Sequence, residues 1–274
     1  MKLLDHGFIE LVETWGSEER IIEAARMSTG KGFQGWGNTC RVCKQEKPTD
    51  PVRQNEGCRG PTLSWNTTEG MFARPHDLVE PPGDDKLLRY LWTHKHSTPF
   101  EMAGATFIVQ APIFVFREWH RHRTQSYNEM SARYVPLPDV NYVPDFENLV
   151  ERWSKGFDTT NKQEASAIGI HLHNNRENLR HWLDLLQRSQ RMAQDAYATA
   201  ISYGVPKELA RLSIPVARYS RMMVSTDLLN WTKFLRLRMA ANAQWEIKQY
   251  ANAACALLEK QFPRTIALFK EETL

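Results

Sequence analysis

One short segment of the sequence combines permanent cations, a titratable imidazole and hydrogen-bonding side chains. Residues 121–134 read Arg-His-Arg-Thr-Gln-Ser-Tyr-Asn-Glu-Met-Ser-Ala-Arg-Tyr. Guanidinium groups bind anions, and the amide, carboxylate and hydroxyl groups that follow can form directed hydrogen bonds. The segment is therefore a candidate site for an anionic ligand with polar edges.

The residues before this segment predict how it is held. Residues 105–111 are β-branched and aromatic enough for a strand, and Pro112 suits the first turn of a helix that runs to Trp119. The triplet 121–123 would then lie at a helix C-terminus, where the helix dipole favours cations. A basic C-terminal cap is thus the alternative to a ligand site. The polar residues continue for about ten positions without the periodicity of a surface helix, so both interpretations stay open.

A second chemical feature is an arginine on an apolar helix face. Residues 228–262 predict one long helix, in which Trp231 and Phe234 lie on the same stripe as Arg238. An unpaired charge on such a stripe is costly, so Arg238 needs a partner or a ligand. A salt bridge to Glu246 is the structural alternative to a ligand.

Residues 29–83 are rich in Gly, Pro, Asn and Thr and predict an irregular insertion. Within it, Cys40-x2-Cys43 and Cys58 are similar to half of a zinc site, with His76 as a possible fourth ligand. A second Cys pair or a His pair is missing, so free thiols are the alternative.

A metal site elsewhere in the sequence is not favoured. His94 and His96 precede Glu101, but Pro99 breaks the helix between them and the carboxylate. A second set of ligands at a typical spacing does not follow. We therefore expect no bound metal ion.

The composition is that of an ordinary globular protein. The chain has 274 residues, of which 42% are hydrophobic and 24% charged, and its net charge of +3 lacks a concentrated basic stripe. Nine tryptophans and the basic triplet leave nucleic-acid binding as an alternative function, against which Glu118 and Glu129 argue. No apolar run approaches the roughly 20 residues that span a bilayer, and residues 1–9 lack a cleavable apolar core. We expect a cytoplasmic protein.

The remaining sequence predicts a mixture of strands and helices. We expect strands over 8–15 and 216–226, and a long helix over 163–203 that ends at Gly204. A short helix over 207–212 carries Arg211, and residues 135–156, with three prolines, predict an irregular connection.

The pattern Arg121-His122-Arg123, seven residues, Ser131 resembles the signature of the flavin-dependent thymidylate synthases, the thymidylate synthase-complementing proteins. Other segments resemble the family in the same order, and no cysteine lies in the motif. The resemblance implies an α+β fold, a mixed or antiparallel sheet packed with long helices, over a single domain 1–274. It also implies that dUMP is converted to dTMP with FAD, NADPH and methylenetetrahydrofolate, in a homotetramer whose sites are shared between subunits, without a membrane or nucleic acid as partner.

The resemblance implies the site residues as well. Arg238 and Ser131 are the expected catalytic residues: Arg238 lies beside the uracil and Ser131 is a hydrogen-bonding group. The expected dUMP contacts are Glu118, Arg121, Glu129, Met130, Ser131, Arg133, Arg211 and Arg238. The expected FAD contacts are His96, Thr98, Glu101, Arg121, His122, Arg123, Asn128, Glu129, Asp227, Leu229 and Lys233.

Some positions depart from the family pattern. Glu118 stands where a glutamine that contacts dUMP is common, which puts a carboxylate near an anionic ligand unless Arg121, one helical turn away, neutralises it. Leu229 and Lys233 replace polar or aromatic-nitrogen residues of the flavin-binding segment, and Asn242 replaces a histidine. These departures motivate a further alternative, a family member that binds nucleotide or flavin without turnover.

Overall fold

The computed structural model describes residues 1–37, 83–154 and 176–273. Contacts between residues divide the chain into two compact units, and the single domain expected from the sequence stays a prediction. Cys40, Cys43, Cys58 and His76 lie outside the described residues. The first unit consists of the described parts of Met1–Glu13, Ala105–Thr226 and Asn230–Leu258. The second consists of the described parts of Thr14–Gly104, Asp227–Leu229 and Glu259–Leu274.

A five-stranded antiparallel sheet in the order β1-β2-β3-β5-β4 confirms the predicted α+β class. The long strand β5 alternates buried and exposed side chains over its first half, as a strand covered on one face does, whereas β3 in the middle of the sheet has no exposed residue. In β5, Met222 and Val224 are buried while Arg221 and Met223 are exposed. The strands are β1 (Lys2–Leu3), β2 (Gly7–Trp15), β3 (Gly104–Pro112), β4 (Ser126–Glu129) and β5 (Tyr219–Asp227).

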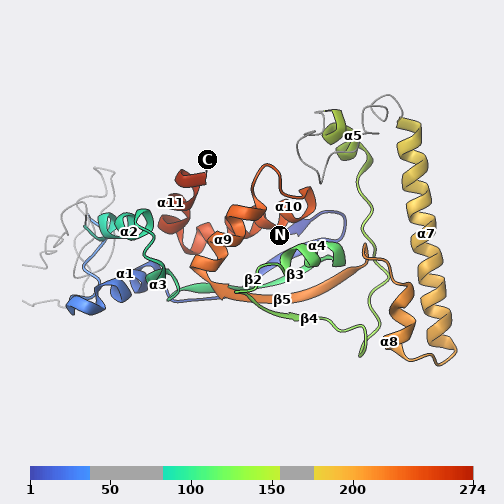
Figure 1. The fold of residues 1–274 in the computed structure, drawn as a ribbon, viewed down its shortest axis with the longest axis horizontal. Helices are drawn as coiled ribbons and strands as arrows, with labels where there is room; N and C mark the ends of the chain where they lie inside the picture. Colours follow the sequence, from blue (N-terminus) through green and yellow to red (C-terminus); the bar gives the residue numbers. More distant parts are fainter. Residues whose placement is uncertain (38–82, 155–175, 274) are drawn as a thin grey trace, which may run out of the picture. The chain divides into compact units, whose positions relative to one another are not determined.

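Helices α4 (Ile113–Trp119), α9 (Leu228–Arg238) and α10 (Trp245–Gln261) lie on one side of this sheet (Figure 1). Their buried aromatic side chains form the centre of the first unit. The ring of Trp119 stacks on Phe234 with a centroid distance of 4.6 Å and meets Tyr250 edge-on at 6.2 Å. The strand over 105–111 and the helix that follows Pro112 are as predicted from the sequence.

The single long helix predicted over 228–262 is wrong, because α9 ends at Arg238 and α10 begins at Trp245. In a straight helix, Phe234 and Tyr250 would lie about 24 Å apart along the axis, at 1.5 Å per residue. Both rings contact Trp119. The helix is therefore interrupted at residues 239–244, because the apolar faces of α9 and α10 both pack against Trp119.

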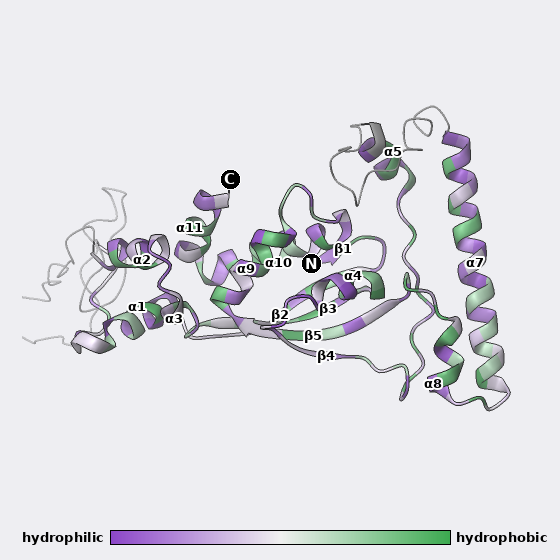
Figure 2. Ribbon diagram, viewed as in Figure 1, coloured by the Kyte–Doolittle hydropathy of each residue, from purple (hydrophilic) through white to green (hydrophobic). Residues whose placement is uncertain are grey.

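The described residues between β4 and β5 are largely helical. Helix α5 (Phe146–Ser154) interrupts the connection predicted to be irregular, and the Asp145 carboxylate accepts a 2.8 Å hydrogen bond from the Asn148 N–H at its start. Helix α7 (Arg176–Ser202) confirms the described part of the predicted long helix, and Figure 2 shows hydrophilic and hydrophobic bands along it. It is followed by α8 (Lys207–Ala210) and the 3-10 helix η3 (Arg211–Ser213). No helix in the described ranges is long and apolar enough to cross a membrane.

The second unit is helical, and two buried carboxylates hold its elements together. Asp84 is fully buried and accepts hydrogen bonds from Arg26 and from the backbone N–H groups of Gln34 and Gly35. The Glu18 carboxylate accepts a 2.6 Å bond from the Thr265 N–H. Because each carboxylate is bonded, its burial is compensated. The helices are α1 (Glu18–Arg26), η1 (Met27–Thr29), α2 (Gly83–Thr93), α3 (Ser97–Phe100) and α11 (Pro263–Thr273).

A buried arginine fixes the segment before α5 to β5 and α7. Arg218 is fully buried, and its guanidinium donates to the Pro138 carbonyl at 2.7 Å, to the Asp139 carboxylate at 3.0 Å and to the Gln194 side chain at 2.8 Å. The three acceptors come from two separate parts of the chain. Arg218 therefore positions Leu137, which lies directly before Pro138 and lines the pocket described below.

We expect Arg218→Met to destabilise the native state by about 2–4 kcal/mol, because it leaves the Pro138 carbonyl and the Gln194 amide oxygen without a donor. Urea unfolding monitored by circular dichroism measures this change. Arg191→Met, which alters an exposed arginine of α7, should change stability by less than about 0.5 kcal/mol. Equal stability of the two variants would contradict the structural role of Arg218.

Candidate active site

The first unit contains a cavity of about 570 Å³ next to the end of β4. Four of the residues predicted to bind nucleotide line it: Glu129, Met130, Ser131 and Arg211. The rest of the lining is largely apolar and includes Ile113, Phe116, Leu137, Leu212, Ile214 and Val216. A cavity that combines apolar side chains with polar groups that can orient a ligand is typical of small-molecule sites.

The register of β4 against β5 determines which side chains reach this cavity. Glu129 pairs with Met222, and the Met130 N–H then donates to the Arg221 carbonyl at 2.8 Å. The chain turns at Ser131, whose carbonyl accepts from the N–H groups of Tyr134 and Val135. The strand thus ends where its last polar side chains line the cavity.

Arg211 reaches the cavity from a distant part of the sequence. It is the first residue of η3, and its Nε donates to the Glu208 carbonyl at 3.3 Å. The side chain is exposed, so its guanidinium is available to an anion. Arg133, which was predicted with it, is exposed and does not line the cavity; its Nε lies 3.8 Å from the Glu208 carboxylate.

The cavity also contains polar residues that the sequence did not single out. Arg117 of α4, His120 directly after this helix and Ser220 of β5 line it. His120 Nε2 lies 3.3 Å from the sulfur of Met222. Their spacing could have indicated them, because Arg117 and His120 lie three residues apart and such residues share one face of a helical segment.

Arg238 lies in a different cluster, with Glu118 and His122. Its Nη1 donates to the Glu118 carboxylate, its Nη2 to the Glu118 carbonyl and its Nε to His122 Nε2, each at 2.9 Å. The guanidinium side chain is 16% exposed. Of the two possibilities considered for Arg238, a partner or a ligand, the structure shows partners within the protein, and its contact with the uracil stays a prediction.

The partner of Arg238 is a different carboxylate from the one considered in the sequence. Glu246, the alternative to a ligand for Arg238, is bonded to the Tyr142 hydroxyl at 3.2 Å and to Arg152 at 3.3 Å, because the helix break separates it from Arg238. The Glu118 carboxylate, for which Arg121 was considered as counter-ion, pairs with Arg238. Arg121 is exposed at the end of α4.

The surroundings of His122 favour its neutral form. Burial, and then the neighbouring Arg238 cation, lower the pKa of His122 to about 4. The ring of Phe234 meets the imidazole edge-on at 4.9 Å. The Tyr127 hydroxyl of β4 lies 2.7 Å from the His122 carbonyl and 3.0 Å from that of Trp119, which ties the loop after α4 to the sheet.

Besides Arg121, three more residues expected at the flavin are exposed on the surface of the first unit. Arg123 follows His122 in the loop, Asn128 pairs with Met223 in the edge strand β4, and the Lys233 ammonium donates to the Asn230 side chain at 3.2 Å. They are accessible to a ligand, whereas the guanidinium of Arg238 is largely enclosed.

Five of the residues expected at the flavin belong to the second unit. His96 precedes α3, and its ring lies 5.7 Å from that of Tyr90. Thr98 and Glu101 are exposed, and the Glu101 N–H donates to the Thr98 carbonyl at 3.1 Å. The members of this group that lie in the second unit are His96, Thr98, Glu101, Asp227 and Leu229.

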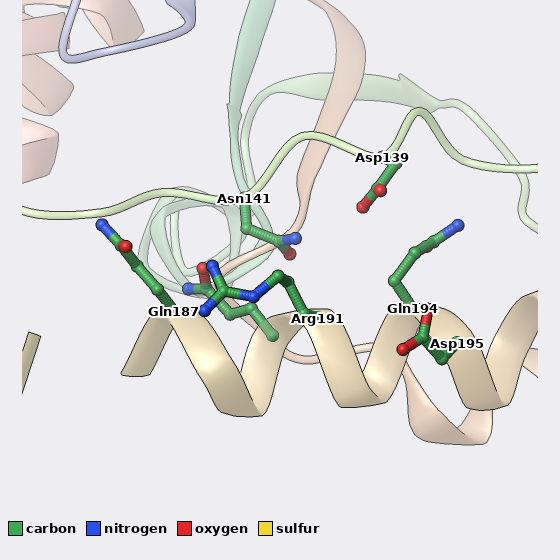
Figure 3. Close-up of a pocket in the computed structure, with 7 residues that line it drawn as sticks. Asp139, Asn141, Gln187, Arg191, Gln194 and Asp195 are labelled. Atoms are coloured by element: carbon green, nitrogen blue, oxygen red, sulfur yellow. The ribbon is translucent and has the colours of Figure 1, made fainter. Parts of the chain in front are cut away.

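A second cavity, of about 310 Å³, lies between α7 and the segment before α5 (Figure 3). In Figure 3, Asp139 and Asn141 face side chains of α7 across the cavity. Two of its charged groups are carboxylates, and none of the predicted site residues lines it. An anionic ligand therefore fits the first cavity better. The α7 residues that line the second cavity are Gln187, Gln190, Arg191, Gln194 and Asp195.

Among the residues that the structure describes, no group of three or more His, Cys, Asp or Glu side chains lies in an arrangement that could hold a metal ion.

We expect the lowered pKa of His122 to make the native state less stable in mild acid. His122 takes up a proton near pH 6.5 in the unfolded chain but only near pH 4 in the folded chain. The contribution of neutral His122 to the free energy of unfolding is therefore complete above pH 6.5 and is lost as the pH falls toward 4. Between pH 7.5 and pH 5, the free energy of unfolding should fall by about 1–2 kcal/mol more in the wild type than in His122→Gln. Urea unfolding at both pH values measures this difference. The exposed His181→Gln serves as the control, and an equal loss in His122→Gln and wild type would contradict the assignment.

Comparison with known proteins places the chain in a family. The family model described as "Thymidylate synthase complementing protein" matches residues 10–264. The flavin-dependent thymidylate synthase of a Thermus thermophilus strain is 34% identical over 273 residues, covering 99% of this chain and 78% of that protein. The enzyme of the same name from Ehrlichia ruminantium Gardel is 33% identical, covering 100% and 73%.

Solved structures agree with these relatives. The chain is similar to the UMP/dUMP methylase PolB from Streptomyces cacaoi bound with 5-Br UMP, with 25% identity, a TM-score of 0.67, and coverage of 100% of this chain and 98% of that one. The same enzyme bound with 5-Br dUMP gives a TM-score of 0.65. Together with the Arg-His-Arg and Ser131 motif and the cavity it borders, these matches show that the chain belongs to the thymidylate synthase complementing protein family.

Proposed function

We propose that this protein is a flavin-dependent thymidylate synthase that methylates dUMP to dTMP. The carbon comes from methylenetetrahydrofolate, and NADPH reduces the FAD. The observation that carries the proposal is the cavity that gathers Glu129, Ser131 and Arg211 in a chain of this family. Relatives that are 33–34% identical carry this enzyme name.

The residues of the cavity suit a nucleoside monophosphate. The exposed guanidinium of Arg211 can bind the phosphate through charge-assisted hydrogen bonds. The Ser131 hydroxyl can donate and accept, so it binds a phosphate or sugar oxygen; the Glu129 carboxylate can accept only from a donor such as a sugar hydroxyl. The apolar lining that includes Ile113 and Phe116 can accommodate a planar base.

Arg238 is the residue we assign to activation of the uracil. Methylation at C5 requires that carbon to become nucleophilic, and a fixed cation stabilises the negative charge that develops on the ring. Arg238 is absent from the described lining of the cavity. A homotetramer in which Arg238 of one subunit completes the cavity of another accounts for this separation, and Arg121 would act from the same side.

The residues expected to hold FAD fit its chemistry in part. Arg121 and Arg123 expose guanidinium groups, and Lys233 an ammonium group, all of which suit a diphosphate. Asn128 and neutral His122 provide hydrogen bonds, whereas the Leu229 side chain cannot. When bound, FAD supplies the hydride that completes the methyl group. We further propose that His96, Thr98, Glu101, Glu129 and Asp227 contact it, and that the enzyme acts in the cytoplasm.

The proposal is tested by the absorbance of the purified protein under anaerobic conditions. A flavin spectrum that bleaches with NADPH and recovers as dTMP appears, once dUMP and methylenetetrahydrofolate are added, supports it. A protein that stays colourless after incubation with FAD contradicts it. Because the structurally similar PolB is a UMP/dUMP methylase, UMP is tested beside dUMP, and preferential turnover of UMP would change the assigned substrate.

We expect Arg211→Ala and Ser131→Ala to raise the KM for dUMP, the former by about tenfold or more, because a hydrogen bond to a charged phosphate contributes about 1.5–3 kcal/mol. Steady-state kinetics with varied dUMP measure the effect. Arg191→Ala, in the second cavity, is the matched control and should leave KM unchanged. A KM that is unaltered in both cavity variants would show that dUMP binds elsewhere.

A further inference from the structure

The group formed by Glu118, His122 and Arg238 fixes a guanidinium at three of its nitrogen atoms. Glu118 provides two acceptors, its carboxylate for Nη1 and its carbonyl for Nη2, and His122 Nε2 accepts from Nε, all at 2.9 Å. A planar guanidinium held at three atoms has a defined position and orientation. Arg238 is therefore positioned within a single chain, before any ligand binds.

The carboxylate of Glu118 is committed to this contact. An ion pair between two exposed side chains contributes little, but here Arg238 is only 16% exposed while the Glu118 side chain is 45% exposed. A mostly buried cation needs a compensating group more than an exposed one does. The pairing thus serves Arg238, the buried partner, and it directs the Glu118 carboxylate away from the role of a nucleotide contact.

The same geometry determines the tautomer of His122. Arginine has only N–H donors, so His122 Nε2 must be the acceptor and carries no proton. Burial and the adjacent cation also keep the pKa of His122 near 4. The ring proton of neutral His122 is therefore on Nδ1, which leaves Nδ1–H as its donor.

The contacts also define what Arg238 can offer a ligand. A guanidinium has five N–H donors, and its bonds to Glu118 and His122 use one donor on each nitrogen, so two remain. The Glu118 carboxylate partly neutralises the cation as well. Arg238 thus presents two directed donors in a fixed plane, with a weaker field than a free arginine would have.

We propose that Glu118 is a positioning residue: it binds Arg238 rather than the nucleotide, and through Arg238 it holds His122 in the Nδ1–H tautomer. The consequence for catalysis rests on the proposed function, because it requires Arg238 to act on the uracil. The positioning itself is a property of the free protein and can be tested without turnover.

The first experiment is 15N NMR of the histidine side chains in the free protein, with His122 assigned from the spectrum of His122→Gln. Wild type should show an unprotonated, hydrogen-bonded Nε2 at neutral pH. The 15N signals of His122 should move toward those of a mixture of tautomers in Glu118→Ala. The same shift is expected in Glu118→Asp, in which the side chain is one methylene shorter. Glu10→Gln removes an exposed carboxylate of β2 and should leave these signals unchanged. A His122 signal unaltered in both Glu118 variants overturns the proposal.

The second experiment is a double-mutant cycle on dUMP turnover with Arg238→Gln. Glu118→Ala should lower kcat about tenfold, the loss of one charge-assisted hydrogen bond, while KM changes less than about threefold. In the Arg238→Gln background, Glu118→Ala should not lower kcat further, because the guanidinium that Glu118 positions is absent. Independent, multiplicative losses, or a large rise in KM, would show that Glu118 contacts the nucleotide and would refute the positioning role.

Two controls keep the outcomes separate. Glu118→Gln retains an acceptor oxygen without the charge and should restore most of kcat relative to Glu118→Ala; circular dichroism confirms that each variant is folded. A wild-type protein that does not methylate dUMP would refute the proposed function alone. The NMR comparison would then still decide whether Glu118 positions Arg238 and His122.

Discussion

The stacking of Trp119 on Phe234 is the contact on which the polar cluster depends. It holds the end of α4 against α9 in the buried centre of the first unit, where both rings are fully buried. Glu118 directly precedes Trp119 and His122 follows it by three residues, while Arg238 lies one helical turn after Phe234. Burying the two aromatic rings together therefore brings the three polar side chains within hydrogen-bonding distance of one another.

The cavity depends on a different constraint, the pairing of β4 with β5. This antiparallel register ends at Glu129, so Met130 and Ser131 reach the cavity just beyond the last pair. The short helices after α7 bring Arg211 to the same place. One chain thus holds two preformed parts, a cavity for an anion and a fixed arginine, each held by its own set of contacts.

Much of the fold could be predicted because local patterns and tertiary contacts agree. The strand over 105–111, the helix after Pro112 and the end of α7 near Gly204 follow from periodicity and from the conformational preferences of Pro and Gly. The connection over 135–156 was predicted less well. Its three prolines indicated an irregular segment, whereas α5 begins directly after Asp145, whose carboxylate caps the helix. Residues 228–262 have a continuous helical pattern, and only the shared contact with Trp119 explains the break.

For the site, residue types and short-range spacing were enough to predict the chemical groups, the motif and the need of Arg238 for a partner. The identity of that partner came from the tertiary structure alone. Glu118 lies 120 residues from Arg238 in the chain, whereas Glu246 is eight positions away, and sequence spacing favours the nearer carboxylate. Contacts between distant residues depend on how the helices pack. The packing of the helices therefore determines that Arg238 bonds to Glu118 and His122, and that Glu246 bonds to Tyr142 and Arg152.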